Sequence, residues 1–251
     1  GNGDFLNWAN ANLGDLDASI SDFDSWVLQI QGPTALDLMA AVTGIDQEAF
    51  SYYAVTEANI NGVACYLSRS GWTGEKGFEI YSKGDDFDGE ALWQYLLTEG
   101  APYNLIASDI ASMHIRRLEA GILDYGTDID QSLNPFELGL GNFVDLSKDD
   151  FIGRAALIKT DRRATRVMGL RSKQVKPIRG DRLTNQTGDT IGTITAGAWS
   201  PYFDSGIGII RLDRPDNEAS GLSLRTEQGQ FDAELCALPF YDPKKLIPRS
   251  K

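Results

Sequence analysis

The pattern of hydrophobic residues changes near residue 166, and this change does most to limit the folds open to the chain. From that point the sequence consists of short runs in which apolar and polar residues alternate, separated by Gly, Asn and Asp. Such alternation is typical of half-buried β-strands, and several strands at this spacing favour a compact barrel or sandwich. The runs that we expect to be strands cover 166–170, 190–196, 206–212, 222–227 and 231–238.

The first part of the chain mixes helical and strand patterns. Gly32 and Pro33 open a helix with one apolar face, and Gly44 ends it. Two predicted strands, 52–58 and 63–69, flank an Asn-Gly pair, which is a strong hairpin-turn signal. Apolar residues at helical spacing predict two further helices: Leu92, Trp93, Leu96 and Leu97 before Gly100, and Ile106, Ile110, Met113 and Arg117. The mixture predicts an α+β domain.

We therefore predict two domains, 1–150 and 151–251, with 151–163 as the connection. The chain of 251 residues contains no internal repeat and no low-complexity tract.

Composition excludes some classes of function. A formal net charge of -13 argues against a nucleic-acid partner, because this surface would repel a polyanion. No run approaches the length of a membrane span, and the N-terminal residues do not resemble a signal peptide. Cys65 and Cys236 follow no metal-ligand spacing, so we predict no metal site, two buried core thiols and a cytoplasmic location.

A glycine-rich turn at 69–81, RSGWTGEKGFEIY, leads into a strand that carries one carboxylate, Glu79. We expect Gly71, Gly74 and Gly77 to give the turn conformations closed to other residues, so that Glu79 is held firmly. Residue chemistry leaves two interpretations open. Glu79 forms a structural ion pair, or it accepts hydrogen bonds from the N–H edge of a ligand.

This turn resembles the R-S/T-G-Y-T-G-E-x-G-F-E motif of the aminomethyltransferase (T-protein) family of the glycine cleavage system. Three further blocks follow the family's order: VLQIQGP at 27–33, RLEAGILDYG at 117–126, and GTITAGAWSP at 192–201 running into GIG at 206–208. Four blocks in order identify the chain as similar to this family over 27–238. The resemblance implies a ferredoxin-like folate-binding region in 1–150, a small C-terminal β-barrel in 151–251, and tetrahydrofolate as cofactor.

The resemblance also implies site residues. The family counterpart of Glu79 accepts hydrogen bonds from the pterin ring, and Trp72 stands where the family has Tyr, to stack on the ring or to pack the loop. Arg117 and Tyr125 complete the expected cofactor-binding set, although we expect Glu119 to form a structural ion pair. We assign Trp199 and Tyr241 to donor binding.

The resemblance begins well after the family's N-terminus. The Asp that the family places beside the reactive nitrogen of folate lies in that earlier segment and has no counterpart in these residues. The catalytic residues therefore stay unknown, and the chain is expected to be a fragment or a processed piece.

One departure from the family bears on the reaction. Glycine-cleavage T-proteins carry an Arg-Asp pair four residues before the Arg of this helix, where this chain has Met113 and His114. We expect His114, the only histidine, to be a helix residue rather than a catalytic base. The departure resembles the methyl-transferring branch, which includes the dimethylsulfoniopropionate demethylases. There, aromatic faces such as Trp72, Tyr125 and Trp199 would receive a sulfonium cation.

The leading hypothesis is therefore methyl transfer from a small methylated donor to tetrahydrofolate. The second is aminomethyl transfer in glycine cleavage, with a lipoyl carrier protein as partner. Two other classes stay open. One is a folate-binding protein without transfer activity, although neither cysteine here has the reactive-cysteine signature of such proteins. The other is the folate-handling tail of a flavin dehydrogenase, although this sequence contains no dinucleotide-binding fingerprint.

Overall fold

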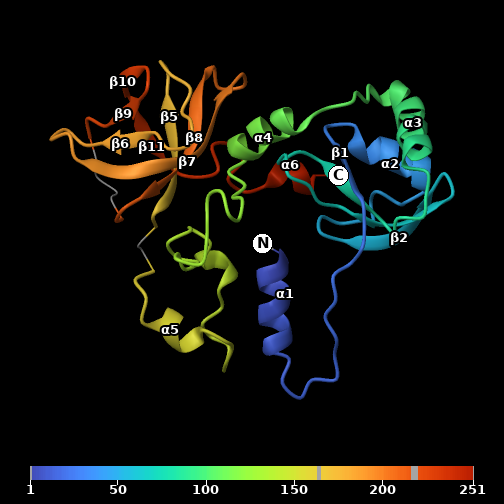
Figure 1. The fold of residues 1–251 in the computed structure, drawn as a ribbon. Helices are drawn as coiled ribbons and strands as arrows, with labels where there is room; N and C mark the ends of the chain where they lie inside the picture. The colour runs from blue at the N-terminus through green and yellow to red at the C-terminus, as the bar shows by residue number, and fades with distance from the viewer. Residues whose placement is uncertain (1, 163–164, 216–219, 251) are drawn as a thin grey trace. The chain divides into compact units, whose positions relative to one another are not determined.

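A computed structural model describes residues 2–162, 165–215 and 220–250. The chain packs as two units, each built around its own sheet (Figure 1). Residues 1–109 with 244–251 form the first unit, and residues 110–243 form the second. The domain boundary expected near residue 150 stays a prediction. The expected connection 151–163 contains a short helix, α5 (Arg154–Ile158). Residue 163, the last of this connection, lies outside the described residues.

The first unit contains a four-stranded antiparallel sheet in the order β1-β4-β3-β2. Its helices and strands are α1 (Asn2–Ala11), β1 (Val27–Gln31), α2 (Ala35–Thr43), β2 (Val55–Ile60), β3 (Val63–Ser68), β4 (Gly77–Ser82), α3 (Gly89–Gly100), the 3-10 turn η1 (Ala101–Tyr103) and α6 (Leu246–Arg249). Gly44 ends α2 in the left-handed conformation, as the sequence predicts, and Asp88 caps α3 by accepting from the backbone N–H of Ala91.

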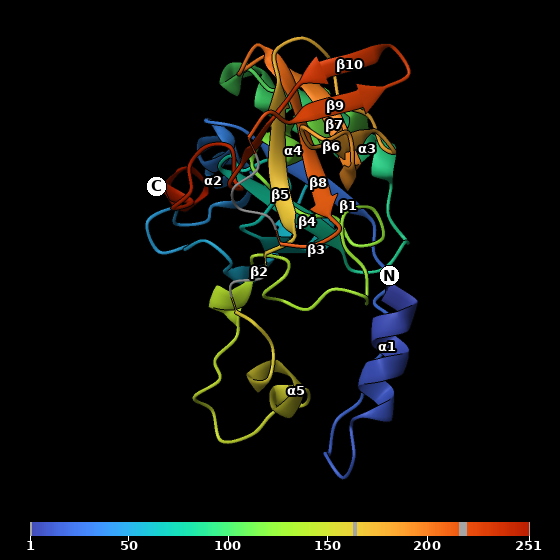
Figure 2. The same cartoon turned by 90° about the vertical axis from the view of Figure 1, so that its left-hand side faces the viewer.

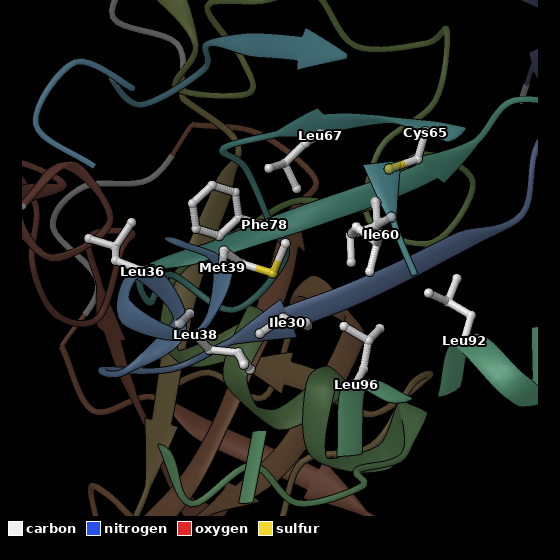
Figure 3. Packing of buried hydrophobic residues seen from close by; sticks show 12 residues of the cluster. Ile30, Leu36, Leu38, Met39, Ile60, Cys65, Leu67, Phe78, Leu92 and Leu96 are labelled. Atoms are coloured by element: carbon white, nitrogen blue, oxygen red, sulfur yellow. The ribbon is translucent and has the colours of Figure 1, made fainter. Parts of the chain in front are cut away.

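Helices α2 and α3 contribute to one hydrophobic core on one face of this sheet (Figure 3). Leu38 and Met39 of α2 lie there with Ile30, Leu67 and Phe78 of the strands, all almost fully buried. On β4, Phe78 and Ile80 belong to this core, so the side chain between them points to the other face of the sheet.

Two local predictions for this unit are corrected. Trp93 is exposed rather than part of the apolar face of α3, because Leu92 and Leu96 take the two positions that face the sheet. The strand expected at 52–58 begins later, at Val55, because residues 51–54 form a turn held by the backbone of Arg69.

The second unit contains a seven-stranded antiparallel sheet in the order β10-β9-β6-β7-β8-β5-β11. Its elements are α4 (Ile110–Glu119), η2 (Gly141–Phe143), α5, β5 (Val167–Ser172), β6 (Arg182–Thr184), β7 (Thr190–Ser200), β8 (Ser205–Leu212), β9 (Ser223–Thr226), β10 (Gly229–Asp232) and β11 (Glu234–Cys236). Strands β9 and β10 form a two-stranded ribbon at one edge (Figure 2).

Topology explains why this sheet curls. The edge strands β10 and β11 lie at opposite ends of the strand order, yet one residue, Ala233, separates them in the chain. A flat seven-stranded sheet would place its edges about 29 Å apart, at about 4.8 Å per strand spacing, so the sheet must curl until its edges approach. The Ser172 hydroxyl donates to the Asp232 carbonyl at 2.8 Å and so connects β5, the neighbour of the edge strand β11, to the edge strand β10.

Helix α4 packs on β7 and β8 through its C-terminal half, where Arg117, Leu118 and Glu119 are buried. Ile106 and Ile110 are instead largely exposed, which corrects the expected apolar face. Helix α4 begins only at Ile110, and its first turn lies beyond β7 and β8, the strands that cover its C-terminal half.

Among the described residues, no helix has both the length and the apolar character needed to cross a bilayer. Cys65 is buried as expected, whereas Cys236 is only half-buried, because it lies on the edge strand β11. Burial raises the pKa of both thiols, that of Cys236 to about 11.

Candidate functional site

The glycine-rich turn before β4 is built around the side chain of Gln31. The Gln31 amide donates from Nε2 to the carbonyls of Ser70 (3.1 Å) and Phe78 (3.3 Å), and its Oε1 accepts from the Thr73 hydroxyl at 2.7 Å. A Cβ at Gly71 would lie 2.1 Å from Oε1 of Gln31, and one at Gly77 would lie 2.4 Å from its Cδ. These two glycines therefore make room for a side chain, and among the three motif glycines only Gly74 has a positive φ, +70°.

The turn holds Glu79 on the face of the sheet opposite the hydrophobic core. Glu79 pairs with Gln29 of β1 and with Ser68 of β3, and its side chain is 8% exposed. Oε1 accepts from Gln29 Nε2 at 3.3 Å, and Oε2 accepts a short hydrogen bond from the Ser70 hydroxyl. The hydroxyls of Ser68 and Ser70 are 2.8 Å apart. Because Ser70 donates to the carboxylate, Ser68 donates to Ser70, which forms a relay of two hydroxyls.

Two tyrosines complete the surroundings of Glu79. Burial raises the pKa of Tyr81, and the charge of Glu79 and a hydrogen bond to it add to the rise. Burial is also the main cause of the raised pKa of Tyr52, and a hydrogen bond with Tyr53 is the second cause. The charge of Glu79 raises this pKa a little further, whereas the charge of Arg249 lowers it. Within the part of the chain that the structure describes, no ion pair joins Glu79 to a Lys or Arg side chain. The nearly buried Glu79 carboxylate is thus satisfied by hydroxyls and an amide rather than by a cation, and its binding of a ligand stays a prediction.

Trp72, the other candidate of the first unit, is half-buried in the turn itself. Its predicted stacking role stays a prediction.

Arg117, a predicted cofactor ligand, lies in a buried ion pair of the second unit. Its Nη1 lies 2.7 Å from Oδ2 of Asp128 and 3.0 Å from the carbonyl oxygen of Ile122. Asp128 also accepts from the Asp124 backbone N–H (2.9 Å) and the Thr195 hydroxyl (2.7 Å). This geometry gives Arg117 a bracing role between α4, the loop after it and the barrel, and binding of a cofactor stays a prediction.

A second buried carboxylate, Glu119, makes the structural ion pair expected of it. Arg116 donates a short hydrogen bond to Oε2, and the Ser200 hydroxyl donates to Oε1 at 2.6 Å. Arg116 also donates from Nη2 to the Tyr241 hydroxyl at 2.7 Å, and its guanidinium lies 5.4 Å from the centre of the Tyr241 ring. Sequence reasoning missed Arg116, since nothing in its neighbourhood separates it from Arg117.

The remaining candidates of the second unit are exposed or half-buried. Tyr125 and Trp199 are exposed, Tyr125 in the loop after α4 and Trp199 near the end of β7. His114 is half-buried on α4, where burial lowers its pKa, Arg117 lowers it further, and a hydrogen bond to the Gly197 backbone opposes the shift.

A cleft of about 390 Å³ opens in the second unit, and no sequence pattern predicted it. Its lining includes guanidinium groups of Arg166, Arg179 and Arg211 as well as carboxylates, among them Asp130, which lies 2.9 Å from Arg211. Because side chains of both charges line this cleft, its charge favours neither an anionic nor a cationic ligand.

Comparison with known proteins gives matches over almost the whole chain. Residues 1–148 match the model of the GCVT N-terminal domain, and residues 165–242 match that of the glycine cleavage T-protein C-terminal barrel domain. An aminomethyltransferase of Saccharopolyspora erythraea is 36% identical over 88% of this chain and 61% of the relative. One of Streptomyces coelicolor is 34% identical over 87% and 60%.

The crystal structure of the glycine cleavage system aminomethyltransferase T from Bartonella henselae superposes with a TM-score of 0.81 at 23% identity, over 95% of this chain and 66% of that one. The predicted fold, α+β followed by a C-terminal barrel, is confirmed by these matches. The chain spans about three fifths of the length of the two curated relatives above.

Proposed function

Because this chain belongs to the glycine cleavage T-protein family, we propose that it transfers one-carbon units to tetrahydrofolate, and that the unit transferred is an aminomethyl group. The names of its relatives support aminomethyl transfer better than the methyl transfer that the sequence alone favoured. The methylamine-bearing lipoyl group of a carrier protein would then be the donor.

Glu79 is the observation that carries the proposal. An ionised carboxylate has about four acceptor sites, and donors from Ser70, Gln29 and Tyr81 occupy three. The N–H edge of a pterin ring would use the remaining site and replace the long Gln29 contact. Two parallel charge-assisted hydrogen bonds would fix the ring in one orientation.

The chain's own contribution to the reaction would be positional. Bound folate supplies a nucleophilic nitrogen. Glu79 would orient the ring that carries it, and the hydroxyl relay would hold the Glu79 side chain in one rotamer. Holding the two reacting groups in line lowers the entropic part of the barrier, and excluding water removes the competing nucleophile.

Methyl transfer is the second candidate, and one observation favours it. Met113 and His114 replace the Arg-Asp pair of the glycine-cleavage enzymes, and Met113 supplies no charge to grip folate or donor. The aromatic candidates do not all fit a cationic donor, because the ring of Tyr241 already receives the Arg116 guanidinium.

The test is a calorimetric titration with tetrahydrofolate, followed by mass spectrometry of the folate product with each donor. Methylene-tetrahydrofolate formed from an aminomethyl-loaded lipoyl carrier supports the first candidate, and 5-methyltetrahydrofolate formed from dimethylsulfoniopropionate supports the second. Binding without either product favours a folate-binding protein, and absence of binding contradicts the proposal. Both this chain and one extended toward the family's N-terminus belong in the titration. The cytoplasmic location stays a prediction.

A further inference from the structure

The backbone of Tyr53 adopts a conformation that bulky residues avoid. Its φ is +67°, in the left-handed region, where Cβ crowds the backbone. The other described non-glycine residues with positive φ are Asn61, Asn104, Asp204, Asp242 and Lys245, mostly the Asn and Asp that tolerate this region. Burial of the ring does not explain the strain, because Tyr53 is 70% exposed.

The surrounding backbone enforces this conformation. The Tyr53 N–H donates to the carbonyl of Arg69 at 2.9 Å, and the Arg69 N–H donates to the carbonyl of Ala54 at 3.0 Å. The guanidinium of Arg69, almost fully buried, donates to the carbonyls of Phe50 and Ser250. Strain that a well-connected turn maintains is found preferentially at binding sites.

The strained turn lies at the same end of the sheet as Glu79. A row of paired residues crosses the strands there, from Val55 through Ser68 and Glu79 to Gln29. Tyr53 stands two residues before Val55, and Arg69, which holds the turn, directly precedes Ser70, the donor to Glu79.

The two tyrosines of the turn support each other. The ring centres of Tyr52 and Tyr53 are 4.1 Å apart. Tyr52 is close enough to Glu79 for the carboxylate to act on its hydroxyl. Tyr52 thus connects the exposed ring of Tyr53 with the carboxylate.

We propose that Tyr53 is a substrate-binding residue. Its ring, held by the strained turn, stacks on the flat heterocycle whose N–H groups donate hydrogen bonds to Glu79. This inference rests on the proposed function and adds a second contact to it. Glu79 accepts hydrogen bonds from the edge of the ring system, and Tyr53 stacks on one of its faces. A turn needed only as a connection would use Gly or Asn at this position, because both adopt a positive φ at lower cost.

Replacement by glycine separates the two roles of Tyr53. Tyr53→Gly relieves the strain and removes the ring, so the ligand-free variant should unfold at an unchanged or higher temperature and bind tetrahydrofolate about tenfold more weakly. Tyr53→Phe keeps the ring and should bind within about twofold of the wild type. Asn104→Gly, which relieves a positive φ of 60° elsewhere in the unit, is the matched control and should change neither quantity by much.

The experiment is calorimetry and thermal unfolding of the full natural chain and these variants, with Glu79→Gln in the same series. If the wild type binds no folate, the proposed function and this inference both fail. Suppose that the wild type binds folate and that Glu79→Gln weakens this binding. If Tyr53→Gly then binds as tightly as the wild type, the inference about Tyr53 alone is overturned. A lower unfolding temperature of Tyr53→Gly would show that the ring serves packing, and equal losses in Tyr53→Gly and Tyr53→Phe would show that the hydroxyl acts. Either result overturns stacking.

Discussion

The amide of Gln31 fills the space that a side chain at Gly77 would need, so a residue of β1 fixes the composition of a turn more than 40 positions later. The family-like glycines at 71 and 77 are therefore a packing requirement. The position of Glu79, two residues after Gly77, depends on the same contact.

Substitution Gly77→Ala should destabilise the first unit by about 1–3 kcal/mol, the usual cost of overpacking a buried site. The added Cβ would lie 2.4 Å from the Gln31 Cδ, and the Gln31 side chain is anchored at both ends of its amide. Chemical denaturation measures the change. Gly89→Ala is the control, because a Cβ there would meet only an ordinary 3.6 Å contact with Phe87, and it should have no destabilising effect.

Substitution Glu79→Gln should preserve the fold and weaken folate binding by about 1–3 kcal/mol, since it removes a charged acceptor. Calorimetric titration gives the affinity. Glu57→Gln changes an exposed carboxylate of the same sheet, paired with Lys83 at 2.8 Å, and should leave binding unchanged. Equal affinity of Glu79→Gln and wild type would remove the role assigned to Glu79.

Removal of Asp128 should affect stability strongly. Asp128→Ala leaves the Arg117 guanidinium buried without its partner, and breaking such a pair costs about 3–5 kcal/mol. Lys83→Ala, which breaks an exposed pair, should cost no more than about 1 kcal/mol. Denaturant unfolding compares the two variants, and similar small losses in both would contradict the bracing role of Arg117 and Asp128.

The thiol of Cys236 should make stability depend on pH in the alkaline range. Burial raises its pKa from 9.0 to about 11 in the folded state, so the folded protein holds this proton more tightly than the unfolded chain. The associated stability is complete below pH 9 and is lost as the pH rises toward 11. Cys236→Ala should flatten this part of the curve of unfolding free energy against pH. An unchanged slope in the variant would assign it to other groups.

The serine relay predicts that binding depends on how firmly Glu79 is held. Ser70→Ala removes a hydroxyl that donates to the Glu79 carboxylate, so folate binding should weaken by about 0.5–1.5 kcal/mol, the usual net contribution of one hydrogen bond. Calorimetric titration would measure the loss, with Ser147→Ala, in an exposed turn with Asp145, as the control. Equal affinity of Ser70→Ala and wild type would remove the role assigned to the Ser70 hydroxyl.

Features that depend on neighbouring residues could be predicted from local sequence patterns. The hairpin turn at Asn61 and Gly62, the end of α2 at Gly44 and the long strands of the barrel follow from local backbone preferences and alternation. These signals act over a few positions, so one sequence displays them without knowledge of the fold. The three-residue strand β6 was missed because so short a segment shows no alternation.

Which side chains act together follows from the packing of elements that are distant in the sequence. Glu79 meets Gln29 from 50 positions away, Arg117 is held by Asp128 and through it by Thr195, and the strain at Tyr53 is maintained by Arg69. Each partner lies on another element, and a buried polar group takes whichever donor or acceptor the packing places beside it. Local propensity contains no information about that choice, because the choice is made when elements distant in the sequence come into contact.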